Sequence, residues 1–131
     1  MKARILFFMI FASILSKAQI NESFSDGNFN KNPEWTGDTA NFRINENLQL
    51  QSNATSTSVS SLFTNSESIV NAEWSAHFII NYSTSSSNYA AMYIIADNND
   101  ITTGLNGYYV QIGGTNDEIS LFLQQKTKKT K

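Results

Sequence analysis

The sequence contains no cysteine, only one proline, Pro33, and only one histidine, His77, among its 131 residues. Without cysteine there is no disulfide, no thiol catalysis and no cysteine-ligated metal site. A single histidine leaves a catalytic triad or a histidine-based zinc site without its other members. The fold therefore depends on its hydrophobic core, and His77 is expected at a solvent-facing or cross-strand position.

Basic residues are also scarce over most of the chain. Residues 19–125 contain two of them, Lys31 and Arg43, against eleven acidic residues, a net charge of −9, and residues 126–131 then add four lysines. An acidic exterior disfavours nucleic acid and anionic membranes as partners, because both are negatively charged. Because the composition changes abruptly after residue 125, we expect residues 126–131 to be a disordered basic tail.

The one long apolar run lies at the amino end. Residues 1–4 carry two positive charges, residues 5–15 are apolar or small, and Ser16-Lys17-Ala18 ends in a small residue. These are the three parts of a secretory signal peptide. The run is too short for the roughly 20 residues of a membrane-spanning helix. The pattern predicts a signal peptide over residues 1–18 with cleavage near Ala18, no membrane span, and a secreted or cell-surface protein.

Strand signals dominate the rest of the chain, and helix signals are poor. A long half-buried strand is expected over residues 72–83, with Trp74, Phe78 and Tyr82 facing inward. Residues 89–96 are apolar on both faces, which favours a central strand paired with it. Further strands are predicted in a hairpin around the turn at residues 45–47, in residues 58–66, and in residues 108–112 and 118–124 around a Gly-rich loop. This pattern predicts one all-β domain over residues 19–125, an antiparallel β-sandwich of the jelly-roll class.

Three stretches carry a family resemblance: "ESFSDGNFNKNPEWTGDTANFRIN", "SNYAAMYIIADNNDI" and "LNGYYVQIGGTNDEISLF". Together they resemble the N-terminal β-sandwich of secreted, multidomain surface proteins of Bacteroidetes, which often carry a lamin-tail or secretion-sorting domain downstream. That sandwich is similar to the concanavalin-A-like and laminin-G-like jelly rolls. In such domains several more strands follow, so the resemblance implies a partial domain and a truncated chain; a genuine short protein with a soluble tail is the alternative. It carries over no catalytic or binding residue.

Retaining glycosidases with this fold use the pattern Glu-x-Asp-x-x-Glu, because an acid and a nucleophile must face the same sugar. The nearest match, "EISLFL", has Glu118 in the first place but Ser120 and Leu123 in the other two. Two of the three required groups are missing. The sequence therefore predicts a protein that is not an enzyme, and Glu118 is expected to be a turn residue.

Exposed aromatic side chains are the feature by which sugar-binding sandwiches hold their ligands, since the apolar face of a sugar stacks on the ring. The candidates are Trp35, Tyr108 and Tyr109, with the amides of Asn106 and Asn32 nearby for the hydroxyl groups. Neighbouring strand positions point to opposite faces, so one at most of Tyr108 and Tyr109 is buried and the other points outward. Core packing of these rings is the alternative interpretation.

The loop "DNNDITTG" concentrates oxygen donors of the kind that hard cations prefer. A weak calcium site using Asp97, Asn99 and Asp100 is one interpretation of this loop, and a solvated turn is the other. No other cofactor is expected.

The sequence as a whole predicts an exported, non-catalytic module of a larger surface protein, acting in carbohydrate recognition or adhesion. Its expected partners are glycans or cell-surface components. The alternative is the N-terminal appendage of a secreted enzyme whose catalytic domain lies in a missing C-terminal part, and a structural spacer is a third possibility.

Overall fold

The computed structural model describes residues 20–66 and 70–131. The signal peptide predicted over residues 1–18, with its cleavage near Ala18, lies outside the described residues. Within the described ranges, no helix is both long enough and apolar enough to span a membrane.

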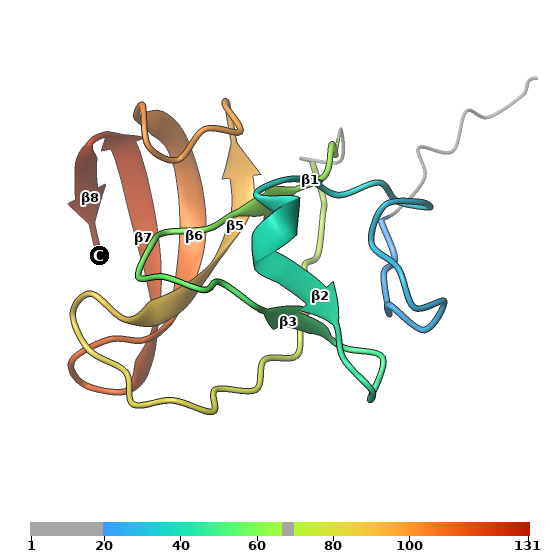
Figure 1. Cartoon of the computed structure of the whole chain (residues 1–131). Helices are drawn as coiled ribbons and strands as arrows, with labels where there is room; N and C mark the ends of the chain where they lie inside the picture. The colour runs from blue at the N-terminus through green and yellow to red at the C-terminus, as the bar shows by residue number, and fades with distance from the viewer. Residues whose placement is uncertain (1–19, 67–69) are drawn as a thin grey trace, which may run out of the picture.

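Four strands form the largest sheet, an antiparallel meander in the order β5-β6-β7-β8 (Figure 1). The strands are β5 (Tyr89–Ala96), β6 (Leu105–Gly113), β7 (Glu118–Lys126) and β8 (Lys128–Thr130). β6 and β7 pair along their whole length, from Leu105 opposite Lys126 to Gly113 opposite Glu118. Their connection uses the predicted glycine-rich loop, in which Gly113, Gly114 and Asp117 all have positive φ.

The amino-terminal half adds two small antiparallel ribbons. β1 (Thr36–Gly37) pairs with β4 (Leu62–Phe63), and β2 (Phe42–Ile44) pairs with β3 (Leu50–Ser52) after the short 3-10 helix η1 (Thr39–Asn41). The β2–β3 hairpin turns at Asn45, whose carbonyl oxygen accepts the Leu48 amide at 3.0 Å. The predicted hairpin around residues 45–47 is therefore confirmed.

The all-β class is confirmed, since nearly all regular structure is strand and every sheet is antiparallel. The jelly-roll sandwich stays a prediction.

Alternation along the strands gives the large sheet two different faces. On one, which we call the inner face, the Tyr109 ring lies between Tyr93 and Phe122, with centroid separations of 4.9 and 5.1 Å. Tyr109 and Leu105 are each 1% exposed. Gln124, 2% exposed, accepts a hydrogen bond from the Tyr93 hydroxyl at 2.6 Å. The core of the described chain is therefore small and lies against this face.

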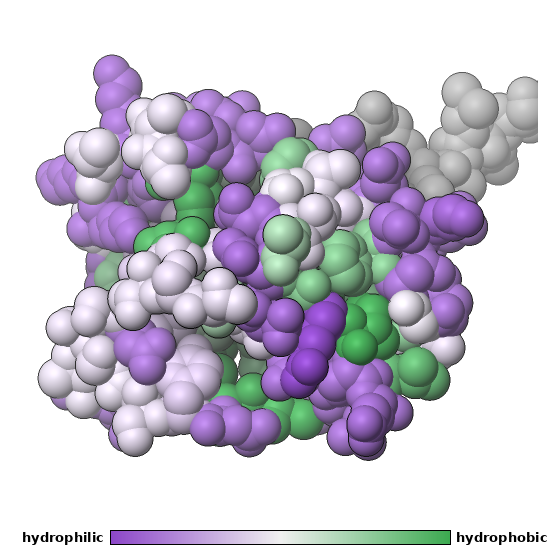
Figure 2. Space-filling view, viewed as in Figure 1, coloured by the Kyte–Doolittle hydropathy of each residue, from purple (hydrophilic) through white to green (hydrophobic). Residues whose placement is uncertain are grey.

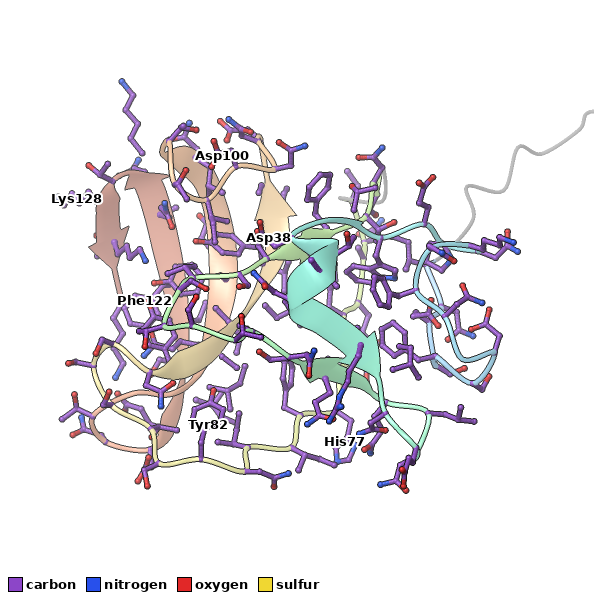
Figure 3. All side chains as sticks on the ribbon, in the orientation of Figure 1. Asp38, His77, Tyr82, Asp100, Phe122 and Lys128 are labelled. Carbon is purple, nitrogen blue, oxygen red and sulfur yellow. The ribbon has the colours of Figure 1, made fainter. Side chains whose placement is uncertain are left out.

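Apolar side chains reach the surface in several other places, as Figure 2 shows for the viewed side. The predicted strand over residues 72–83 is wrong: these residues form no strand, and Trp74, Phe78 and Tyr82 are 41%, 39% and 44% exposed. A strand requires a hydrogen-bonded neighbour, and this segment does not pair with β5. For the same reason β5 is an edge strand and not the predicted central one. His77 is exposed, as predicted (Figure 3).

The predicted disordered tail over residues 126–131 is also wrong. β7 continues to Lys126, and β8 pairs with it through Leu123 opposite Thr130 and Gln125 opposite Lys128. The Lys131 ammonium group lies 2.5 Å from the Glu118 carboxylate. The lysines thus extend the sheet beyond the predicted domain end at residue 125, because backbone pairing and opposite charge favour order there.

Candidate functional site

The candidate site lies on the other side of the large sheet, which we call the outer face. β6 and β7 direct alternate side chains to it, and their register places Tyr108 opposite Leu123 and Val110 opposite Leu121. Tyr108 is 45%, Leu121 55% and Ile119 76% exposed. On β5, β6 and β7 this face carries no charged residue; its members are Ala90, Met92, Ile95, Asn106, Tyr108, Val110, Ile112, Ile119, Leu121, Leu123 and Gln125.

Polar groups gather at one end of the outer face, around Asn106. The Asp97 carboxylate accepts the backbone N–H and the side-chain Nδ2 of Asn106, both at 2.7 Å. The Asn106 side-chain oxygen accepts the Lys126 amide at 3.2 Å. These hydrogen bonds from Asn106 hold the pKa of Asp97 below its ordinary value. Asn106 is therefore fixed in orientation, and Gln125 lies directly across from it on β7.

The structure separates the aromatic residues proposed from the sequence. Tyr108 points outward and Tyr109 is buried, which confirms that the two adjacent tyrosines have different environments. Tyr109 is therefore wrong as an exposed platform, because its ring is stacked in the core. Burial, followed by the neighbouring Tyr89 and Tyr93, raises the pKa of Tyr109 to about 12.

Trp35 lies elsewhere, just before β1, and is half-buried against Phe24 with ring centroids 6.3 Å apart. Its indole Nε1 is buried and has no hydrogen-bond partner among the described residues. Tyr108 belongs to the large sheet and Trp35 to the end of the small β1–β4 ribbon, so the two do not form one platform. Asn32, on the same approach to β1, is exposed.

The predicted calcium loop is held together by its own side chains. Asp100, labelled in Figure 3, accepts the Thr102 backbone amide at 2.8 Å and the Thr102 hydroxyl at 2.6 Å. Hydrogen bonds from Thr102 lower the pKa of Asp100. The Asp97 carboxylate instead accepts a hydrogen bond from the Asn106 side chain on β6, and Asn99 is exposed. In the part of the chain that the structure describes, no three His, Cys, Asp or Glu side chains gather as a metal would require, so calcium binding stays a prediction.

A hollow of about 400 Å³ lies beside the β6–β7 turn and was not predicted from the sequence. The Thr84 hydroxyl closes one side of it, with hydrogen bonds to the Gly114 carbonyl oxygen at 2.9 Å and to the Asp117 carboxylate. Gly113 was the available signal, because a Cβ at this position would lie 2.6 Å from Thr84 Cγ2. The hollow is lined by Ile80, Tyr82, Ser83, Thr84, Ile112, Gly113 and Asp117.

Comparison of the chain with protein-family models, with characterised proteins and with solved structures finds no match. The functional proposal therefore rests on the residues of this chain.

Proposed function

We propose that the protein is an exported, non-catalytic surface module that recognises neutral glycans through the outer face of its large sheet. The observation that carries this proposal is the exposed ring of Tyr108, 45% accessible in the middle of a nine-residue strand pairing. A ring held on a rigid strand offers a flat apolar surface at little entropic cost. The apolar side of a sugar can stack on such a surface.

The amides at the same end of the face supply the polar part of recognition. Asn106 lies two residues before Tyr108 and shares its face, and Gln125 is opposite Asn106. Each atom of the Asn106 amide group makes one hydrogen bond, which leaves one N–H and one lone pair for a ligand. These groups match sugar hydroxyls, which both donate and accept.

Charge and the positions of the carboxylates support a neutral ligand and a role without catalysis. Residues 19–131 contain eleven acidic and six basic residues, a net charge of −5, which disfavours acidic glycans. Glycoside hydrolysis requires two carboxylates flanking one sugar. Glu118, the one candidate from the sequence, pairs with Gly113 at the far end of β7 from Asn106 and forms an ion pair with Lys131.

The proposal is tested with the protein expressed from the full sequence and soluble neutral polysaccharides, such as β-glucan, xylan and mannan, in affinity electrophoresis and calorimetry. We expect one of them to bind, and Tyr108→Ala to weaken that binding at least tenfold. Tyr82→Ala is the matched control, because Tyr82 is 44% exposed but lies off the sheet. Binding by none of the neutral polysaccharides, or equal loss in both variants, overturns the proposal.

A further inference from the structure

β5 is an open edge of the large sheet, and its one irregularity is the register shift between Tyr93 and Ile95, which leaves residues 89–93 as a regular edge. Its eight residues, "YAAMYIIA", include no charge and no proline. Natural edge strands are usually blocked by charges, proline or a covering segment, because their free N–H and C=O groups pair readily with another strand. The regular part of this edge, residues 89–93, is therefore able to accept a further strand.

The turn before β5 already forms the first rung of such a pairing. Ser85 and Asn88 form an isolated antiparallel bridge and exchange both backbone hydrogen bonds, at 2.9 and 3.2 Å. Two residues, Ser86 and Ser87, connect the pair, as in a short β-hairpin. Neither has positive φ, so the turn is not of the primed type that matches the twist of two paired strands, and the arms diverge in the state seen here. One arm of the hairpin is β5, and the other arm would be residues 80–84.

At the next hydrogen-bonded position of this pairing, a side chain takes the place of a backbone amide. Asn88 Nδ2 donates to the Ser83 carbonyl oxygen at 2.9 Å, where a continued ladder would place the Ala90 amide. Successive strand residues direct their backbone groups to opposite edges. The backbone groups of Asn88 point to Ser85 across the turn. Those of Ala90 and Met92, two and four residues further on, therefore point to the open edge of β5.

Continuing the register of this bridge gives a defined set of partners. Ser83 would pair with Ala90, and Ile80 with Tyr93. Ile80 would then lie on the inner face beside the packed rings of Tyr93 and Tyr109. Tyr82, now 44% exposed, would lie on the same face opposite Ala91. In Figure 1 the yellow segment before β5 instead leaves the foot of the sheet.

We propose that residues 80–83 pair with the β5 edge as a fifth strand, so that the protein has a closed state besides the open one seen here. Closing exchanges the Asn88 to Ser83 bond for ladder hydrogen bonds and shields the exposed ring of Tyr82 together with the half-buried Ile80. It also removes Ile80 and Tyr82 from the wall of the hollow beside the β6–β7 turn. The hollow therefore belongs to the open state. This inference is independent of glycan binding.

Disulfide trapping tests the register directly, because the chain has no cysteine of its own. In the closed state Tyr82 and Ala91 form a pair without hydrogen bonds, with Cα atoms about 4.5 Å apart, which suits a disulfide. Under mild oxidation the double variant Tyr82→Cys with Ala91→Cys should form an intramolecular disulfide. The control, Tyr82→Cys with Met92→Cys, is one residue out of register and should react at least tenfold more slowly.

Equal rates in the two double variants, or disulfides only between molecules, overturn the proposal, since the latter would mean that the strand comes from a second copy. The unmodified protein gives a second measurement that does not depend on either variant folding. In the closed state the Ala90 and Met92 amides should exchange with deuterium at least tenfold more slowly than the exposed Asn99 amide. Exchange of both amides at the rate of Asn99 contradicts a closed state.

Discussion

The Lys129 ammonium group lies 5.5 Å from the centre of the Tyr109 ring, the most deeply buried aromatic ring of the large sheet. The pairing of Lys129 with Gln124 brings this lysine to the inner face. A cation above an aromatic ring contributes about 0.5–1 kcal/mol at an exposed position. The lysine-rich end of the chain thus helps to cover the core.

Replacing Lys129 by alanine should lower the free energy of unfolding by about 0.5–1 kcal/mol, because the contact with the Tyr109 ring is lost. Lys128→Ala is the control, since Lys128 is a neighbouring exposed residue of β8 on the opposite face. Urea unfolding of both variants measures the difference. If the two substitutions lower the free energy of unfolding equally, the contact of Lys129 with the Tyr109 ring adds no stability beyond the effect of any positive charge on β8.

Stability should fall in alkali because of Tyr109. Its pKa is about 12 in the folded protein, above its ordinary value of 10.0, so the folded state keeps a proton that the unfolded state loses. The stabilising contribution is complete below pH 10 and is lost as the pH rises from 10 towards 12. Urea unfolding between pH 9 and 11.5 measures this slope. Tyr109→Phe should have a shallower slope, and an unchanged slope would contradict the assignment.

The alternation of β6 and β7 and the glycines between them were sufficient to predict those strands, because the pattern and the turn agree. Residues 72–83 show that alternation alone is not enough, since a strand also requires a partner and they do not pair with the free edge of β5. Lysine content predicted a solvated tail, but pairing with β7 and the contact of Lys131 with Glu118 order it. Strand pairing is a tertiary property, so these features could not be predicted from local sequence.

The same distinction applies to the site. That Tyr108 and Tyr109 face opposite ways followed from strand geometry. Which of them is buried depends on the packing of Tyr109 between Tyr93 and Phe122, which come from other strands. The hydrogen bonds between Asp97 and Asn106 join residues nine positions apart and required the structure.

Acid should release Asn106 from Asp97. Hydrogen bonds from Asn106 lower the pKa of Asp97 below its ordinary value of 3.8, so their stabilising effect is present above pH 3.8 and is lost as the pH falls through the lowered pKa. The amide proton shift of Asn106 should therefore titrate with a midpoint below 3.8. Asp97→Asn should abolish this titration. A midpoint at or above 3.8 would show that the hydrogen bonds from Asn106 do not stabilise the ionised carboxylate of Asp97.

Gly113→Ala should destabilise the β6–β7 turn more than Gly27→Ala destabilises its own turn. Both glycines have positive φ, +95° and +77°, so both substitutions introduce backbone strain of about 1 kcal/mol. Only at Gly113 would the new methyl group meet a neighbour, 2.6 Å from Thr84 Cγ2. The excess loss in thermal unfolding measures that contact. Equal losses would mean that Thr84 moves aside freely.

Substitutions on the two faces of β7 should differ in how much stability they cost. Ile119 is 76% exposed on the outer face, so Ile119→Thr should change the free energy of unfolding by less than about 0.5 kcal/mol. It should also reduce self-association in sedimentation, because it breaks up the exposed apolar surface. Phe122 stacks on Tyr109 on the inner face at 5.1 Å, so Phe122→Ala should cost about 3 kcal/mol. A large loss for Ile119→Thr in the monomer would show that the outer face is covered within the chain, and Tyr108 would then be inaccessible to glycans.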